Sequence, residues 1–110
     1  MKLPADALIA MDKLTRYLLV PQARADKSAF LAGAGYTKDN AELLLRDLRS
    51  QILPLDATAL ESNQFGQYYE IRGRLTGPTG VTLVVRTIWM TEHLPGTTKF
   101  VTLIPGKQGA

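Results

Sequence analysis

The residues best suited to chemistry in this chain are cationic, and most of them lie in its second half. Clustered guanidinium and ammonium groups bind phosphate, and they stabilise the charge that develops on phosphorus when a phosphodiester is cleaved. The competing interpretation is that these are solvated strand residues whose stems pack over neighbouring aromatic rings. Both interpretations stay open for Lys27, Arg72, Arg74, Arg86 and Lys99.

Arg86 is the most informative of these residues because it lies inside the most apolar strand candidate, residues 81–90. A guanidinium in a central strand needs either a partner or open water. We predict Lys27 and Arg86 as cations that contact phosphate or stabilise the transition state, and Thr87 as a hydrogen-bond donor. These three residues form the candidate catalytic set, and no cofactor-binding or metal-binding residues are predicted.

Other kinds of active site find little support in the sequence. Zero cysteines exclude disulfides and thiolate metal sites. The single histidine, His93, lies in a polar turn beside Glu92 and is expected to be solvated. The serines have no nucleophile-elbow context, and no phosphate-binding glycine motif is present. Glu61, Glu70 and Glu92 fall in different predicted elements, so they do not suggest paired-carboxylate chemistry.

The length and composition predict one globular domain over residues 1–110. The chain has 110 residues, of which 45% are hydrophobic, and this is enough for a single core. No apolar run approaches the roughly 18 residues of a membrane span, so we expect no membrane contact and a cytoplasmic protein. The net charge of +3 is compatible with a phosphate-bearing or acidic partner, and also with a mildly basic surface that only keeps the protein soluble.

Apolar spacing changes from a helical to a strand period near the middle of the chain. Helices are predicted near residues 11–19, 26–34 and 37–52, with Gly35 as a left-handed C-terminal cap and Thr37 as an N-cap. Four strands are expected near residues 57–62, 67–75, 81–90 and 99–104, with a tight hairpin turn at residues 76–80. The fold class is therefore α+β: about three N-terminal helices packed on a four-stranded antiparallel β-meander.

The predicted helices can cover only one face of this sheet. Trp89 shares its face with valines and leucines, so we expect it in the core and not as a platform for stacking bases. The opposite face mixes arginine with apolar side chains, which is typical of a binding surface. Side chains expected on this second face are Arg72, Arg74, Arg86, Thr102, Phe100 and Ile104.

Five segments of the chain are specific in their order and spacing: KLTRYLLVP, DKSAFLAGAGYT, FGQYYEIRGRLTGPTG, VRTIWM and KFVTLIP. In these segments the chain resembles a bacterial family of small domains of unknown function that is common in cyanobacteria. The resemblance covers roughly residues 13–105. Members of that family occur as short stand-alone proteins, often encoded beside another small protein. Similar domains also resemble the C-terminal ends of larger polymorphic toxins and phage head proteins.

The resemblance implies a toxin-like effector of a bacterial two-protein system, with metal-independent RNA cleavage as its candidate chemistry. RNA and a neighbour-encoded small protein are the partners it implies. The alternative is a non-catalytic protein-interaction module, and whether the protein is an enzyme stays open at this point. Many relatives carry a longer loop with a histidine after the first helix, whereas residues 20–26 of this chain contain none. If that histidine is catalytic in the relatives, this protein is inactive or uses another group.

Overall fold

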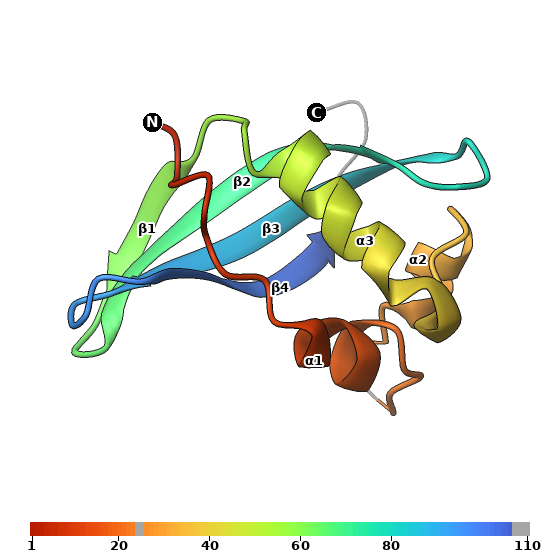
Figure 1. Cartoon of the computed structure of the whole chain (residues 1–110), viewed down its shortest axis with the longest axis horizontal. Coiled ribbons are helices and arrows are strands. Elements are labelled where there is room, and N and C mark those ends of the chain that lie inside the picture. The colour runs from red at the N-terminus through yellow and green to blue at the C-terminus, as the bar shows by residue number, and fades with distance from the viewer. Residues whose placement is uncertain (24–25, 107–110) are drawn as a thin grey trace.

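The helices of this protein cover one face of a single antiparallel sheet (Figure 1). The computed structural model describes residues 1–23 and 26–106. Within these residues the chain forms three helical segments before residue 53 and four strands after residue 57. The predicted α+β class, with helices first and an antiparallel meander second, is confirmed.

The first helical segment consists of α1 (Met11–Lys13) and the π-helical turn η1 (Leu14–Leu18), and the second is α2 (Ser28–Ala32). The third is continuous through the 3₁₀ turn η2 (Lys38–Asn40), α3 (Ala41–Asp47) and the π-helical turn η3 (Leu48–Ile52). The strands are β1 (Thr58–Ser62), β2 (Gly66–Thr76), β3 (Thr82–Glu92) and β4 (Thr98–Pro105), and they are neighbours in that order.

Polar and glycine residues set the helix ends much as the sequence predicts. Asp26 precedes α2, and its Oδ1 accepts hydrogen bonds from the Ser28 amide at 2.9 Å and the Ser28 hydroxyl at 2.6 Å. Gly35 has the predicted left-handed conformation, with a φ of 95°. Thr37 and Asn40 form a reciprocal capping box at the start of the third segment. Residues 24 and 25, between the first two predicted helices, lie outside the described residues.

The core lies between the third helical segment and the covered face of the sheet. Leu44, Leu48 and Ile52 are fully buried on one side of that helix, as its apolar period predicts. Gly73 of β2 lets the chain just after this helical segment lie close to the sheet. A Cβ at residue 73 would lie only 2.5 Å from Leu55 Cδ1. None of the helices among the described residues is long and apolar enough to cross a membrane.

Trp89 is fully buried, so its predicted place in the core is confirmed. Its ring packs edge-on against Phe100, with ring centroids 5.3 Å apart and an interplanar angle of 73°. The indole Nε1 donates to Thr87 Oγ1 at 2.8 Å, and the Thr87 hydroxyl donates to the Ile71 carbonyl at 3.0 Å. The core therefore satisfies the polar atoms of both side chains.

The expectation that Phe100 shares the open face with Thr102 is wrong. Thr102 pairs with Ile88, but Phe100 pairs with Trp89, so β4 contains one extra residue at Val101. Such a β-bulge reverses the alternation of side chains on one side of it. Burial of the Phe100 ring against Trp89 fits this reversal, and Phe100 is 2% exposed.

The first nine residues form an extended segment that the sequence analysis does not predict. Lys2 pairs with Asp56 just before β1, and Leu8 pairs with Lys99 in β4. The Leu8 amide donates to the Thr98 carbonyl at 2.8 Å, and the Phe100 amide donates to the Leu8 carbonyl at 2.7 Å. The segment thus crosses the helical side of the sheet from β1 to β4 (Figure 1), and it covers the first part of the β4 edge.

Candidate functional site

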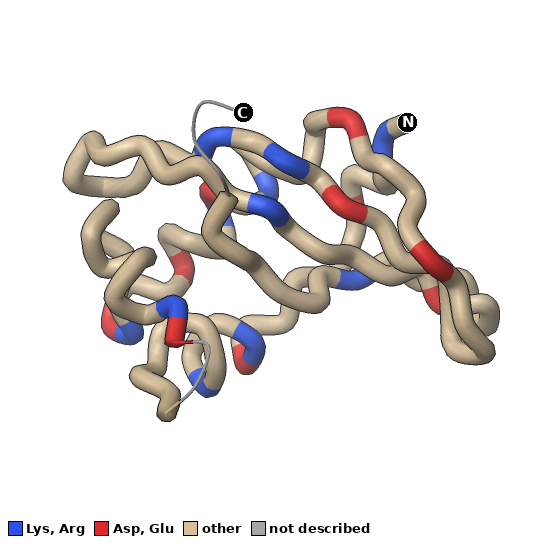
Figure 2. Tube along the Cα trace, turned by 180° about the vertical axis from the view of Figure 1, so that it is seen from behind, with Lys and Arg blue, Asp and Glu red and all other residues tan. Residues whose placement is uncertain are grey.

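The face of the sheet that the helices leave uncovered, called the open face below, carries the candidate site. Figure 2 views this face and shows basic and acidic positions next to each other on neighbouring strands. Arg72 of β2 lies directly opposite Arg86 of β3. Glu70 and Arg74 lie two residues before and two residues after Arg72, so strand alternation places them on the same face.

Glu70 is held between two guanidinium groups, and we call Glu70, Arg72 and Arg86 the Glu70 cluster. Arg86 Nη2 and Nε donate to Glu70 Oε2 at 2.5 Å and 3.0 Å, and Arg72 Nε donates to Glu70 Oε1. The Glu70 side chain is 9% exposed, whereas those of Arg86 and Arg72 are 36% and 67% exposed. The carboxylate is therefore covered, while the arginines keep N–H groups directed at solvent.

The two arginines decide the ionisation of Glu70. Burial by itself raises the pKa of this carboxyl, but the hydrogen bonds and charges of Arg72 and Arg86 outweigh burial. The pKa of Glu70 therefore lies below its ordinary value of 4.5, and the group is a carboxylate at neutral pH. Around the Glu70 cluster, Arg74 adds a third positive charge against the single negative charge of Glu70, and the Glu92–Lys99 pair elsewhere on this face is neutral, so an anion is favoured beside the arginines.

The structure does not bring the three predicted site residues together. Arg86 lies on the open face, but Thr87 lies on the covered face, where it is fully buried and bonded to Trp89 and Ile71. Lys27 immediately precedes α2, and its Nζ donates to Thr102 Oγ1 at 3.2 Å. Lys27 thus reaches β4 from the helical side, whereas the Arg86 guanidinium is directed at Glu70 on β2.

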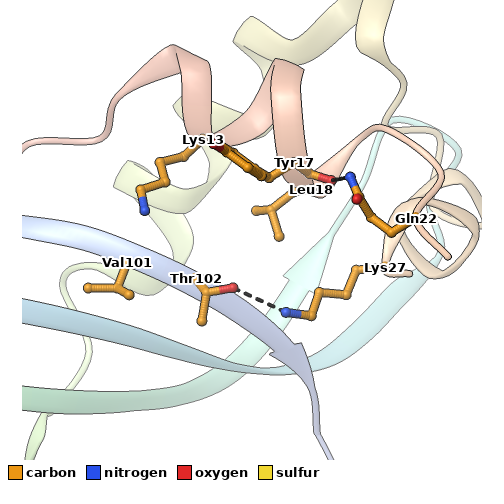
Figure 3. Close-up of a pocket in the computed structure, with 7 residues that line it drawn as sticks. All are labelled: Lys13, Tyr17, Leu18, Gln22, Lys27, Val101 and Thr102. Atoms are coloured by element: carbon orange, nitrogen blue, oxygen red, sulfur yellow. Dashed lines mark hydrogen bonds between the residues drawn. The ribbon is translucent and has the colours of Figure 1, made fainter. Parts of the chain in front are cut away.

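Lys27 instead lines a pocket of about 310 Å³ between η1 and β4 (Figure 3). The Lys13 and Lys27 side chains both extend into the space between these elements. Thr102 belongs to this pocket and also faces the open side of the sheet, because it pairs with Ile88. The pocket is therefore next to the open face but separate from the Glu70 cluster.

Glu70 is the functional candidate that the sequence analysis set aside. The hairpin turn is the sequence signal that could have identified Glu70. Once Thr76 is placed opposite Thr82, counting away from the turn along both strands puts Arg72 opposite Arg86. Glu70 then becomes a diagonal neighbour of Arg86 on the same face. Within its own strand Glu70 shows no sign of this site, because one of its two arginine partners lies on the neighbouring strand.

A Glu70→Gln substitution is expected to lower the free energy of unfolding by about 1–2 kcal/mol at pH 7. The neutral amide leaves two opposed guanidinium groups without their shared counter-charge, and the exposure of both arginines keeps the effect moderate. The pKa of Glu70 is lower in the folded state, so the stabilisation is complete above about pH 4.5 and is lost as the pH falls through the folded pKa.

Urea unfolding at pH 7 and at several values below 4.5 measures this effect. The difference between wild type and Glu70→Gln should be largest at pH 7 and should shrink as the solution becomes more acidic. Glu61→Gln is the matched control, since Glu61 is exposed in β1 and makes no ion pair with any described residue. A difference that stays constant from pH 7 to pH 3 would show that the Glu70 charge is not its source.

Metal ligands do not gather anywhere in the described part of the chain: no three His, Cys, Asp or Glu side chains there lie close enough to hold an ion. His93 lies in the turn after β3, and its Nε2 is 2.8 Å from the Asn63 carbonyl oxygen, so it ties two turns together. The charged groups of the Glu70 cluster are one carboxylate and two guanidinium groups.

Comparisons with known proteins identify a family. No curated protein and no solved structure matches this chain. One family model does match, over residues 2–107, which is nearly the whole chain. This match confirms the predicted membership of a domain family of unknown function. The protein belongs to the family described as Domain of unknown function (DUF6883).

Proposed function

We propose that this protein is a toxin-like effector of a bacterial two-protein system that cleaves RNA without a metal ion. The observation that supports the proposal is the Glu70 cluster on the open face: an ionised carboxylate beneath two partly exposed guanidinium groups. Metal-independent cleavage needs a proton acceptor and cations that stabilise the charge developing on phosphorus. The cluster supplies both kinds of group from two adjacent strands.

The proposed reaction is an internal transfer of the phosphoryl group. Arg72 and Arg86 bind the non-bridging phosphate oxygens, while a Glu70 oxygen accepts the proton of the ribose 2′-hydroxyl. The 2′-oxygen bonds to phosphorus, and the bond from phosphorus to the 5′-oxygen of the next nucleotide breaks. That 5′-oxygen takes a proton from water, and the products are a 2′,3′-cyclic phosphate and a free 5′-hydroxyl.

Phosphate binding would also make Glu70 a better proton acceptor. Its pKa is held low by N–H groups of Arg72 and Arg86. When phosphate oxygens take over some of these donors and add negative charge nearby, the stabilisation of the carboxylate weakens and its pKa rises. A group that is ionised in the free protein can then accept a proton in the complex.

The remaining surface of the open face suits single-stranded RNA. Tyr68 lies on this face opposite Met90 and is half-buried, so part of its ring is available to a base. Ile88 is likewise half-buried between β2 and β4. Proteins that bind single strands combine basic groups for the phosphates with aromatic surfaces on which bases stack.

Incubation of purified protein with RNA in the presence of a chelator tests the proposal. The expected result is fragmentation of RNA that depends on Glu70 and continues in EDTA. Intact RNA across a wide range of pH, with and without added divalent ions, would contradict the proposal and leave the alternative function.

The alternative is a non-catalytic module that binds a protein. It is favoured by the places of two predicted site residues, because Thr87 is buried in the core and Lys27 lies beyond β4 from Arg86. In this case the basic open face or the exposed strand β1 is the surface that a partner covers.

Co-purification with the neighbour-encoded small protein separates the two functions. We expect a complex that is tighter at low salt than at high salt, because the open face is basic. A complex that abolishes RNA cleavage supports the effector, whereas a complex of a protein that never cleaves RNA supports the module. No complex at any ionic strength would exclude the two-protein system.

A further inference from the structure

The pocket between η1 and β4 has the chemistry of an anion site with an aromatic wall (Figure 3). Lys13 and Lys27 supply two ammonium groups, and Leu18, which is buried, lies at its base. The Tyr17 side chain lines the same space and is largely exposed. Among the residues that the structure describes, no carboxylate lines the pocket, so the two positive charges there favour a bound anion.

The acidic residues that adjoin the two lysines in the sequence, Asp12 and Asp26, are engaged elsewhere. Asp26 accepts the amide and hydroxyl hydrogen bonds of Ser28, and Asp12 lies 4.0 Å from Arg16 on the exposed side of the first helical segment. Lys27 is positioned by its hydrogen bond to Thr102 Oγ1. The ammonium group is therefore fixed at the pocket wall by a neutral partner, and its charge is not cancelled there.

The pocket also has a defined relation to the Glu70 cluster. Thr102 pairs with Ile88, which lies two residues from Arg86 on the same face of β3. Thr102 is therefore a diagonal neighbour of Arg86, at a Cα separation of roughly 7–8 Å. A strand of nucleic acid that crosses β3 toward β4 would pass from the arginines to the two lysines.

We propose that this pocket binds the nucleotide next to the cleaved phosphate in a single-stranded RNA. Lys13 and Lys27 hold the phosphate of that nucleotide, and its base stacks on the Tyr17 ring. Gln22, whose side-chain nitrogen donates to the Tyr17 and Val20 carbonyls, lines the pocket beside Tyr17. The inference rests on the proposed RNA cleavage and adds to it a subsite that fixes where the substrate strand runs.

Adenosine 3′,5′-bisphosphate is a suitable probe because it carries a base and two phosphates but no phosphodiester that the protein can cleave. Titration of the wild-type protein, followed by backbone amide NMR shifts in 0.1 M salt, should perturb residues 13–22, Lys27 and Thr102. Removal of both ammonium groups, in Lys13→Gln with Lys27→Gln, is expected to weaken binding at least ~10-fold. Tyr17→Ala is expected to weaken it about 10-fold, since stacking on one base is lost.

The matched control is Arg16→Gln with Lys38→Gln, which removes the same number of positive charges from exposed positions outside the pocket. Its affinity should stay within about twofold of wild type. Equal weakening in the control, or shifts confined to Arg72 and Arg86, would overturn the subsite. Binding in the pocket by a protein that leaves RNA intact would reject the RNase function alone, whereas RNA cleavage without binding there would reject the subsite alone.

Discussion

Replacing Trp89 with alanine is expected to lower the free energy of unfolding by about 3–5 kcal/mol. The indole is fully buried and packs against Phe100, so its removal leaves a cavity at the centre of the sheet. The substitution also removes the N–H that donates to Thr87 Oγ1, although the Thr87 hydroxyl keeps its own bond to Ile71. A domain of this size has a total stability of roughly 5–15 kcal/mol, so the loss is large.

Urea unfolding followed by far-ultraviolet circular dichroism measures this loss without relying on tryptophan fluorescence. Tyr17→Ala is the control, because it also deletes an aromatic ring but from a side chain that is 62% exposed. We expect this control to change stability by less than about 0.5 kcal/mol. A loss for Trp89→Ala as small as that of the control would contradict the buried position of the indole.

Replacing Arg86 with alanine is expected to reduce RNA cleavage about 100-fold, which corresponds to roughly 3 kcal/mol of transition-state stabilisation. Arg86 gives two N–H donors to Glu70 and lies in a central strand with its side chain 36% exposed, so its guanidinium is held in place before substrate binds. The same substitution should relieve the growth inhibition that we expect when the wild-type protein is expressed.

Arg74→Ala is the matched control for this experiment. Arg74 lies on the same face and is exposed, and it forms no ion pair with a described residue. Its loss should weaken RNA binding a few-fold and leave the maximal cleavage rate nearly unchanged. If Arg86→Ala remains folded by circular dichroism and cleaves RNA at the wild-type rate, Arg86 has no role in catalysis.

The elements of this fold could be predicted because local patterns specify them. The period of 3.6 in the third helix, the capping box at Thr37 and the left-handed Gly35 all agree with their sequence signals. The turn at residues 76–80 likewise predicts a tight hairpin, and the Gly80 amide donates to the Gly77 carbonyl at 2.9 Å. Each of these signals depends on residues close together in the chain.

The features that the sequence did not reveal depend on long-range pairing. Val101 is an ordinary strand residue by composition, so nothing local predicts the bulge there. The bulge is explained by the packing of Phe100 against Trp89. The residues around Leu8 show no periodic apolar pattern that would predict their pairing with β4. Only a few backbone hydrogen bonds hold this segment. Glu70 became a candidate only when the register placed two arginines around it.

The most direct test of the proposed function is the end chemistry of a short RNA incubated with the purified protein in EDTA. Mass spectrometry should find fragments that end in a 2′,3′-cyclic phosphate, because the proposed attacking group is the ribose 2′-oxygen. An RNA with a single 2′-deoxynucleotide before the cleaved bond should be resistant at that bond and still be cleaved elsewhere. RNA that remains intact, or cleavage that continues at the 2′-deoxy position, would contradict the proposed reaction.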